Sequence, residues 1–237
     1  MSLAAHELLD VWERALPLPP ARRALALLAV AADDAPEALA RLPVGRRDAQ
    51  LLRLRERLFG SRLQALANCP ACGEQLELDF DAADIRAPEA LPGGPLTIEA
   101  QGYRVRFRLP SSLDLAVLAP GDSTLRLLEC CVAEAFFEEA AIGASELPPA
   151  IVAAVAAEMS RADPQADVRL ALVCPSCGHD WPAPFDIVAF LWAELDAWAR
   201  RTLRDIHTLA TAYGWREVDI LALSPWRRQF YLQMVAG

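Results

Sequence analysis

The stretch Cys69-Pro70-Ala71-Cys72-Gly73 decides the fold, because its pattern returns later in the chain as Cys174-Pro175-Ser176-Cys177-Gly178. Both stretches read C-P-x-C-G. One such turn supplies two thiolates, and two turns complete the tetrahedral set of four cysteines that holds a structural zinc ion. The glycine after each pair suits a backbone position with positive φ, which lets amide groups approach the sulfurs. The sequence therefore predicts zinc as the cofactor, with the ligands Cys69, Cys72, Cys174 and Cys177.

The likeness between the two stretches extends beyond the cysteines. Phe80 and Phe185 both follow the first cysteine of their pair by eleven residues, and Asp81 and Asp186 follow it by twelve. Upstream of both pairs, apolar residues alternate in the same phase, as they do in half-buried strands. We therefore expect two related β-hairpins that clamp one metal ion, with everything between them inserted.

Two other uses of paired cysteines fit the sequence less well. A redox C-x-x-C motif opens a helix after a strand, whereas each pair here is followed by residues that suit a strand. A catalytic zinc keeps one position open for water and has three protein ligands. His179 follows Cys177 closely and is an alternative ligand, but we expect it beside the site or on the surface. Cys130 and Cys131 lie in an apolar run at 125–137, and we interpret them as buried helix thiols.

The composition of the 237 residues excludes several classes of function. All 23 basic residues are arginine. The lysine of a P-loop, of a Schiff base or of a pyridoxal-phosphate site is therefore missing. The formal net charge is −9, and an acidic chain binds nucleic acid poorly because phosphates need a basic face. With 54% hydrophobic residues, the chain can bury the core of one large domain or of two small ones.

The sequence carries no sign of secretion or of a membrane span. Its first residues include acidic side chains where a signal peptide has basic ones. No apolar run reaches the ~18 residues of a spanning helix. Six cysteines without a secretion signal suit a metal site in a reducing compartment better than disulfides. We therefore expect a protein of a reducing cytoplasm without a membrane partner.

Periodicity and turn residues predict an α+β protein with a split four-cysteine zinc-ribbon β core, an inserted helical segment and helical arms at both ends. Five segments are expected: an N-terminal helical arm at 1–60, a first zinc hairpin and a second β-hairpin at 61–110, a helical insertion at 111–165, a second zinc hairpin at 166–186 and a C-terminal helical segment at 187–237. The expected helices are 3–16, 20–32, 36–41, 46–59, 112–118, 123–138, 148–161, 187–213, 215–222 and 225–235. The second β-hairpin is expected to pair 96–100 with 103–109.

Arginine occupies every other position of the last of these strands. Arg104, Arg106 and Arg108 alternate with apolar residues. They could form a basic recognition stripe. The interpretation that fits better is the solvated face of an edge strand, where charge also blocks aggregation.

Aromatic residues are dense near the C-terminus, where five of the six tryptophans fall in the last quarter of the chain. Such residues form cores and also dominate protein interfaces, and the sequence does not separate the two. The candidate partner-binding residues are Trp215, Trp226, Arg227, Arg228, Phe230 and Tyr231. The helical spacing at 209–234 also allows a helix-turn-helix, but one arginine pair in an acidic chain supports DNA binding poorly.

No catalytic residue is assigned. The histidines are only His6, His179 and His207, and the chain lacks G-x-S-x-G, H-E-x-x-H and G-x-G-x-x-G. A Ser/His/Asp or Cys/His arrangement stays open until coordinates decide it. We expect a protein that is not an enzyme.

Three stretches carry a family resemblance. The first includes Asp205-Ile206-His207-Thr208-Leu209-Ala210, Tyr213-Gly214-Trp215-Arg216-Glu217, Ile220-Leu221-Ala222-Leu223-Ser224-Pro225, Arg227-Arg228 and Tyr231-Leu232. The second begins at Asp163-Pro164-Gln165-Ala166-Asp167 and runs through the second C-P-x-C-G, and the third is Phe107-Arg108-Leu109-Pro110-Ser111 with Asp114. The first resembles the C-terminal signature of the T-even-type phage base plate proteins, and the other two resemble the zinc-ribbon members of that group.

Those proteins are small hub-assembly proteins of contractile phage tails and related contractile injection systems. The resemblance implies a non-enzymatic assembly factor, a chaperone or a minor base plate component that binds tail hub, base plate or tape-measure proteins. It implies assembly in the bacterial cytoplasm and leaves open both retention in the finished particle and the oligomeric state. The alternatives are a zinc-ribbon adaptor with an unrelated protein partner and, less favoured, an enzyme or nucleic-acid binder.

Overall fold

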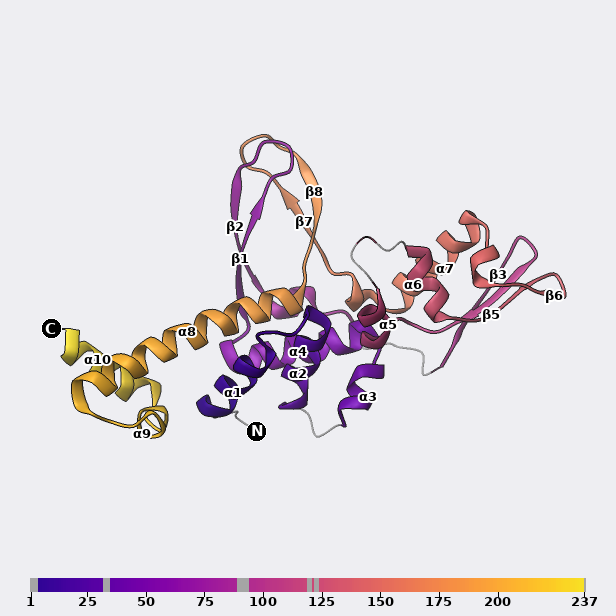
Figure 1. The fold of residues 1–237 in the computed structure, drawn as a ribbon. Coiled ribbons are helices and arrows are strands. Elements are labelled where there is room, and N and C mark those ends of the chain that lie inside the picture. The colour runs from indigo at the N-terminus through magenta and orange to yellow at the C-terminus, as the bar shows by residue number, and fades with distance from the viewer. Residues whose placement is uncertain (1–3, 32–34, 89–93, 119–120, 122–123, 237) are drawn as a thin grey trace. The chain divides into compact units, whose positions relative to one another are not determined.

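A computed structural model describes residues 4–31, 35–88, 94–118, 121 and 124–236. Its helices and strands form an α+β fold, as predicted, and divide into two compact units (Figure 1). The central unit comprises Asp34–Ile187, and the terminal unit joins Met1–Asp33 to Val188–Gly237. The expected N-terminal arm at 1–60 is thus divided, because its first 33 residues group with the C-terminal helices and the rest belongs to the central unit.

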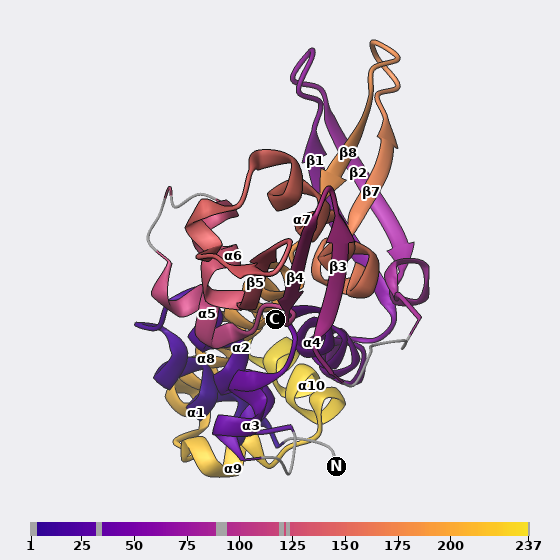
Figure 2. The same cartoon turned by 90° about the vertical axis from the view of Figure 1, so that its right-hand side faces the viewer.

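Two separate antiparallel hairpins of the central unit carry the two C-P-x-C-G turns. The first pairs β1 (Arg62–Asn68) with β2 (Gln75–Asp81), and the second pairs β7 (Arg169–Val173) with β8 (Asp180–Pro184). Along each strand, side chains largely alternate between an exposed and a more buried face. Figure 2 shows the hairpins side by side with their turns at the same end. The structure confirms both predicted hairpins.

A second sheet is built from the chain between these hairpins. Its four antiparallel strands run in the order β3 (Leu96–Ala100), β4 (Tyr103–Phe107), β5 (Val132–Phe137) and β6 (Ala140–Ala141). Two helices, α6 (Thr124–Cys131) and α7 (Pro149–Ala162), contribute to the same core. The buried residues of this core are Val105, Phe107, Leu128, Cys131, Ala135, Leu147, Ile151, Val155 and Met159.

The helix predicted at 123–138 is wrong in its second half. α6 ends at Cys131, and the chain continues as β5 from Val132, paired with β4. β5 contains a valine and two phenylalanines, residue types that favour strands. β4 also offers unpaired backbone groups that a neighbouring strand can satisfy. Pairing in the sheet therefore overrides the local helical pattern.

β4 is an inner strand, which corrects the prediction of an edge strand. It lies between β3 and β5. Its arginines are exposed, as predicted for a solvated face. Arg106 forms an ion pair with Glu134 at 3.5 Å, and Arg104 lies 5.0 Å from the centre of the Phe136 ring. These two arginines therefore contact β5 across the sheet instead of facing a free edge.

A long helix, α4 (Val44–Phe59), contributes further core residues of the central unit, with Leu51, Leu52 and Leu54 fully buried. Short helices connect the other elements: α3 (Pro36–Arg41), η1 (Ala82–Ile85), α5 (Ser112–Val117), η2 (Ala144–Glu146) and η3 (Pro164–Ala166).

The terminal unit is entirely helical. It consists of α1 (Ala5–Ala15), α2 (Pro20–Ala29), α8 (Ile187–Tyr213), α9 (Glu217–Leu221) and α10 (Pro225–Ala236). Trp12 Nε1 donates a hydrogen bond of 3.0 Å to Asp196, and Arg23 lies 4.4 Å from the centre of the Trp192 ring. Both N-terminal helices therefore contact α8. Among the described residues, no helix is long and apolar enough to cross a membrane.

Candidate metal centre

Four cysteine side chains gather at the turns of the two hairpins. The sulfurs of Cys69, Cys72, Cys174 and Cys177 all lie within 4.8 Å of one another. Cys69 Sγ is 3.7 Å from Cys177 Sγ, and Cys72 Sγ is 3.6 Å from Cys174 Sγ. A tetrahedral site with Zn–S bonds of about 2.3 Å places its sulfurs about 3.8 Å apart, whereas a disulfide needs about 2.0 Å. The spacing therefore fits a metal ion and does not fit two disulfides.

Backbone hydrogen bonds shape both turns in the same way. The Gly73 N–H donates to the Cys69 carbonyl at 2.9 Å, and the Cys69 N–H donates to the Glu74 carbonyl at 2.8 Å. The second turn repeats both bonds at the same lengths through Gly178 and Cys174. The two glycines have φ of +78° and +71°, a conformation that is strained for residues with a side chain. The C-P-x-C-G pattern is therefore needed for the shape of the turn as well as for its thiols.

Equivalent residues of the two hairpins face each other. In each pair the first cysteine is buried and the second is exposed. Each close sulfur contact joins the first cysteine of one pair to the second cysteine of the other. Phe80 and Phe185, which hold equivalent positions, meet edge to face with ring centroids 5.8 Å apart. The repeat in the sequence is thus an approximate twofold repeat in the structure.

The clustered thiols change one another's protonation. Burial acts to raise the pKa of Cys69, but the N–H groups of Cys72 and Ala71 and the neighbouring thiols lower it to about 7. At Cys72 the N–H of Glu74 acts to lower the pKa, but hydrogen bonds with the other thiols raise it to about 12. Four thiolates this close repel one another, so a cation is needed to keep all of them deprotonated at neutral pH.

The donor set fits a structural zinc ion. Four thiolates fill the coordination shell of zinc and leave no place for a catalytic water. His179 is exposed, and its ring stacks on that of Trp181 at a centroid distance of 5.9 Å. Within the part of the chain that the structure describes, the cysteines form the one group of metal-ligating side chains close enough to hold an ion.

The hairpins have little core of their own to keep them together. Each is a sheet of only two strands. Most apolar side chains on their more buried faces, including Leu76, Leu170 and Trp181, are only half-buried. Isolated two-stranded hairpins are at best marginally stable in water. A metal cross-link at their turns would therefore contribute strongly to this part of the fold.

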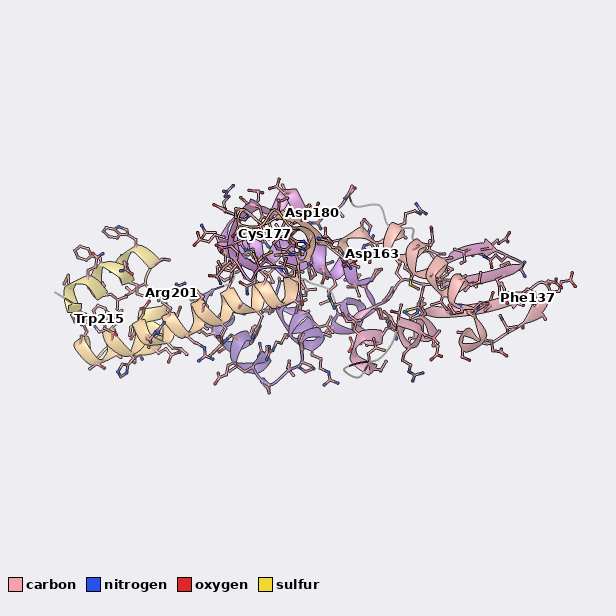
Figure 3. All side chains as sticks on the ribbon, turned by 90° about the horizontal axis from the view of Figure 1, so that it is seen from above. Phe137, Asp163, Cys177, Asp180, Arg201 and Trp215 are labelled. Carbon is pink, nitrogen blue, oxygen red and sulfur yellow. The ribbon has the colours of Figure 1, made fainter. Side chains whose placement is uncertain are left out.

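A buried carboxylate anchors the end of the insertion. Asp163 accepts a hydrogen bond of 2.8 Å from the Gly45 N–H at the start of α4 (Figure 3). A Cβ at position 45 would lie 1.8 Å from Asp163 Oδ1, so this contact requires glycine. Gln165 accepts a hydrogen bond from the Ala87 N–H at 2.7 Å and donates one to the Ile85 carbonyl at 3.3 Å. These bonds connect the residues just before β7 to the start of α4 and to the residues that follow β2.

An ion pair anchors the chain after β4 in a similar way. Arg108 donates two hydrogen bonds of 2.7 Å to Asp114, and the N–H and hydroxyl of Ser111 donate to the same carboxylate. Burial acts to raise the pKa of Asp114, but these donors lower it to about 2. The Val44 N–H also donates to the Pro110 carbonyl at 2.9 Å. This stretch is therefore fastened to the start of α4.

The anchoring stretches and the cysteine cluster fall within one match to a known family. A family model described as T4 bacteriophage base plate protein matches residues 26–192. The chain belongs to this family. A search of curated proteins and a search of solved structures found no match. The family resemblance of the sequence is thus confirmed, and the match covers most of the chain, including all four clustered cysteines.

The C-terminal stretch that resembles base plate proteins in sequence lies outside this match. The matched region ends at residue 192, in the first part of α8. The residues from Asp205 onward are therefore not covered by the family model. Their part in the function stays a prediction from the sequence.

Three of the candidate partner-binding residues of this base plate protein are turned inward. Trp215 and Tyr231 are half-buried, and their rings meet edge to face with centroids 4.9 Å apart. Figure 3 labels Trp215 beyond the C-terminal end of α8. Arg228 is buried, and its Nη2 donates long hydrogen bonds to the Leu221 and Leu223 carbonyls. These three residues hold α9 and α10 together.

The other three candidates, Trp226, Arg227 and Phe230, are exposed on α10. Met234 is exposed on the same helix and was missing from the predicted set. Its position, eight residues after Trp226 and four after Phe230, is the signal that would have found it. All these residues belong to the terminal unit, whereas the four clustered cysteines belong to the central unit.

The remaining two cysteines lie apart from the cluster, at the end of α6. Cys131 is buried in the core of the four-stranded sheet, and burial raises the pKa of its thiol to about 12. Cys130 is half-buried. The prediction of two buried helix thiols is therefore correct for Cys131 and wrong in burial for Cys130. A protonated, buried Cys131 is an inert core residue.

Proposed function

We propose that this base plate family member is a non-enzymatic assembly factor or a minor base plate or hub component of a contractile tail. The tail is that of a phage or of a contractile injection system. The observation that carries the proposal is the family match over residues 26–192, which takes in the whole central unit. The protein acts by binding other tail proteins.

Zinc has a structural role in this proposal. The sulfur spacing, the two identical turns and the closed set of four thiolates support it. Zinc binding contributes roughly 10 kcal/mol or more to the folding of small zinc domains. That contribution offsets the entropy of closing the long insertion between the two cysteine pairs. The bound ion makes the two hairpins one rigid body that can be presented to a partner.

The partners we propose are tail hub, base plate or tape-measure proteins. Nucleic acid is a poor partner for a chain with a formal charge of −9. Arg106 and Arg108, two of the three arginines on and just after β4, are already paired with carboxylates. The protein acts in the bacterial cytoplasm while the tail is assembled, as a chaperone that leaves or as a component that stays.

Co-expression with the neighbouring tail genes tests this function. The tagged full-length protein should recover a hub, base plate or tape-measure protein that survives a high-salt wash. The same gene cluster with an untagged chain is the control. Recovery of unrelated proteins alone would contradict the proposal and indicate a zinc-ribbon adaptor instead. Mass spectrometry of purified tails then shows whether the chain stays in the particle.

A further inference from the structure

The last helix, α10, carries large side chains on two different sides. One side is turned into the terminal unit, where Arg228 is buried and Tyr231 and Leu232 are half-buried. These residues account for the packing of α10 against its own unit. Packing within the terminal unit does not explain the large apolar residues on the other side of α10.

Trp226, Phe230 and Met234 form an outer stripe along that other side. Their side chains are 75%, 50% and 56% exposed. Residues four apart lie in one row on a helix, and the rings of Trp226 and Phe230 stack with centroids 5.7 Å apart. Aromatic residues and methionine are the types enriched in interface cores. Three of them in one exposed row mark an interaction surface.

We propose that the outer stripe docks an acidic amphipathic helix of another tail protein. This inference rests on the proposed function and names the kind of partner that the tail protein binds. A row of side chains four apart is one ridge of a helix surface, and such a ridge packs into the groove between two rows of a second helix. A helix with an apolar face therefore matches the stripe along its length.

Charge around the stripe selects an acidic partner. Residues 200–237 contain six arginines but only three acidic side chains. Arg200 is already paired with Asp196 and Arg216 with Asp219, so the excess of positive charge comes from the other four arginines. α10 itself has two arginines and no acidic residue. Arg227 is exposed beside the stripe and has no ion-pair partner among the described residues. Aspartate or glutamate at the edge of an incoming helix would pair with Arg227 and orient the complex.

Two other occupants are disfavoured, a second copy by the local charges of α10 and nucleic acid by the net charge of the whole chain. A second copy of α10 would offer the stripe only glutamine and arginine along its edges, and no carboxylate to pair with Arg227. A single-stranded nucleic acid can stack on exposed aromatic rings. The net negative charge of the chain opposes its phosphates, however. Both occupants are outcomes that an experiment can distinguish from an acidic helix.

Photo-crosslinking through the stripe identifies the occupant directly. Full-length protein with benzoylphenylalanine at position 230 is co-expressed with the neighbouring tail genes and irradiated. The same residue at position 211, which is exposed on α8, is the matched control. We expect crosslinks from position 230 alone, to a segment with an apolar row and flanking acidic residues. A crosslink to a second copy, to nucleic acid or to no macromolecule would overturn the proposal.

A defined peptide measures the affinity. The probe is a synthetic helix with leucines four residues apart and glutamates at the edges of the row, and its twin has lysines instead. By fluorescence anisotropy, the glutamate peptide should bind at least about tenfold more tightly, and Trp226→Ala or Phe230→Ala should weaken it about tenfold or more. Val218→Ala removes a side chain that is 63% exposed outside the stripe and should change nothing. Equal binding of both peptides, or no effect of Trp226→Ala, would overturn the docking surface.

The two proposals can fail separately. Hub binding that survives both Trp226→Ala and Phe230→Ala refutes the docking surface and leaves the tail function intact. A crosslink from position 230 to an acidic helix of a protein unrelated to tails supports the docking surface and refutes the tail function. Because the substituted side chains are largely exposed, the melting temperature of each variant should match that of the wild type.

Discussion

Replacing Cys72 with serine removes one ligand of the proposed zinc ion and shows how much that ion stabilises the fold. Zinc would cross-link two cysteine pairs that are separated by about 100 residues, and a cross-link around such a loop stabilises a protein by about 4.7 kcal/mol through chain entropy. The hairpins are two-stranded, and most of their apolar side chains are only half-buried. Little else would compensate for the lost cross-link. We therefore expect the free energy of unfolding to fall by about 4–5 kcal/mol through this chain-entropy contribution alone.

Urea unfolding followed by circular dichroism, together with elemental analysis, measures this effect. The wild type should contain about one zinc per chain, and Cys72→Ser should contain much less. With a slope of about 2 kcal/mol per molar urea, the unfolding midpoint should fall by about 2 M. Cys130→Ser is the matched control, because it replaces a half-buried thiol outside the cluster.

Two results would refute this reasoning. An equal loss of stability in Cys72→Ser and Cys130→Ser would show that the effect comes from the exchange itself and not from a metal ligand. A wild-type protein without metal, whose four clustered thiols titrate freely or oxidise in pairs, would remove the zinc ion and favour redox chemistry.

Three further changes test other contacts of the central unit. Gly45→Ala should cost about 3–5 kcal/mol of stability, because its Cβ would lie 1.8 Å from Asp163 Oδ1 and displace a buried, hydrogen-bonded carboxylate. Thermal unfolding checks this, and Gly94→Ala is the control because its added Cβ meets nothing within 4 Å; similar losses in both would contradict the prediction. Asp114→Asn should cost about 2 kcal/mol at pH 7, because the pKa of Asp114 is about 2 in the folded protein and about 4 in the unfolded chain. The ionised carboxylate therefore stabilises the fold above pH 4, and this stabilisation is lost as the pH falls from about 4 to 2. Urea unfolding measures the difference in free energy of unfolding between this variant and the wild type. A difference that stays constant between about pH 4 and pH 2 would contradict the prediction. Phe80→Ala and Phe185→Ala should show a coupling of about 1 kcal/mol in a double-mutant cycle, because their rings touch; simple additivity would argue against a direct contact.

Local patterns in the sequence were sufficient for most of the elements. The predicted helix at 187–213 matches α8, and the first predicted strand of the second β-hairpin matches β3. The second predicted strand, 103–109, covers β4 and runs two residues past its end. The proline starts of α3 and α10 were predicted correctly. These features depend on neighbouring residues, through side-chain periodicity, turn residues and the fixed φ of proline.

The gathering of the four thiols was also predictable, because the same short motif occurs twice with equivalent flanking residues. The hydrogen bonds that fix the path of the insertion between the two cysteine pairs were not predictable from the sequence. Asp163 and Gly45 are 118 residues apart, and a lone aspartate and a lone glycine carry no signal of their contact. Only the stretch of Asp163 stood out, through the family resemblance.

Short stretches of sequence were enough to predict the ligands of the proposed metal site, the shape of its turns and the helical character of both chain ends. Each of these follows from chemistry within a few residues, such as two thiols and a glycine in one turn. Only the tertiary structure decided that 132–137 is a strand, that β4 lies inside its sheet and that the N-terminal helices pack on α8. The physical reason is that unpaired strand edges and apolar helix faces are satisfied by whichever distant segment reaches them. Local propensity is too weak to decide that choice.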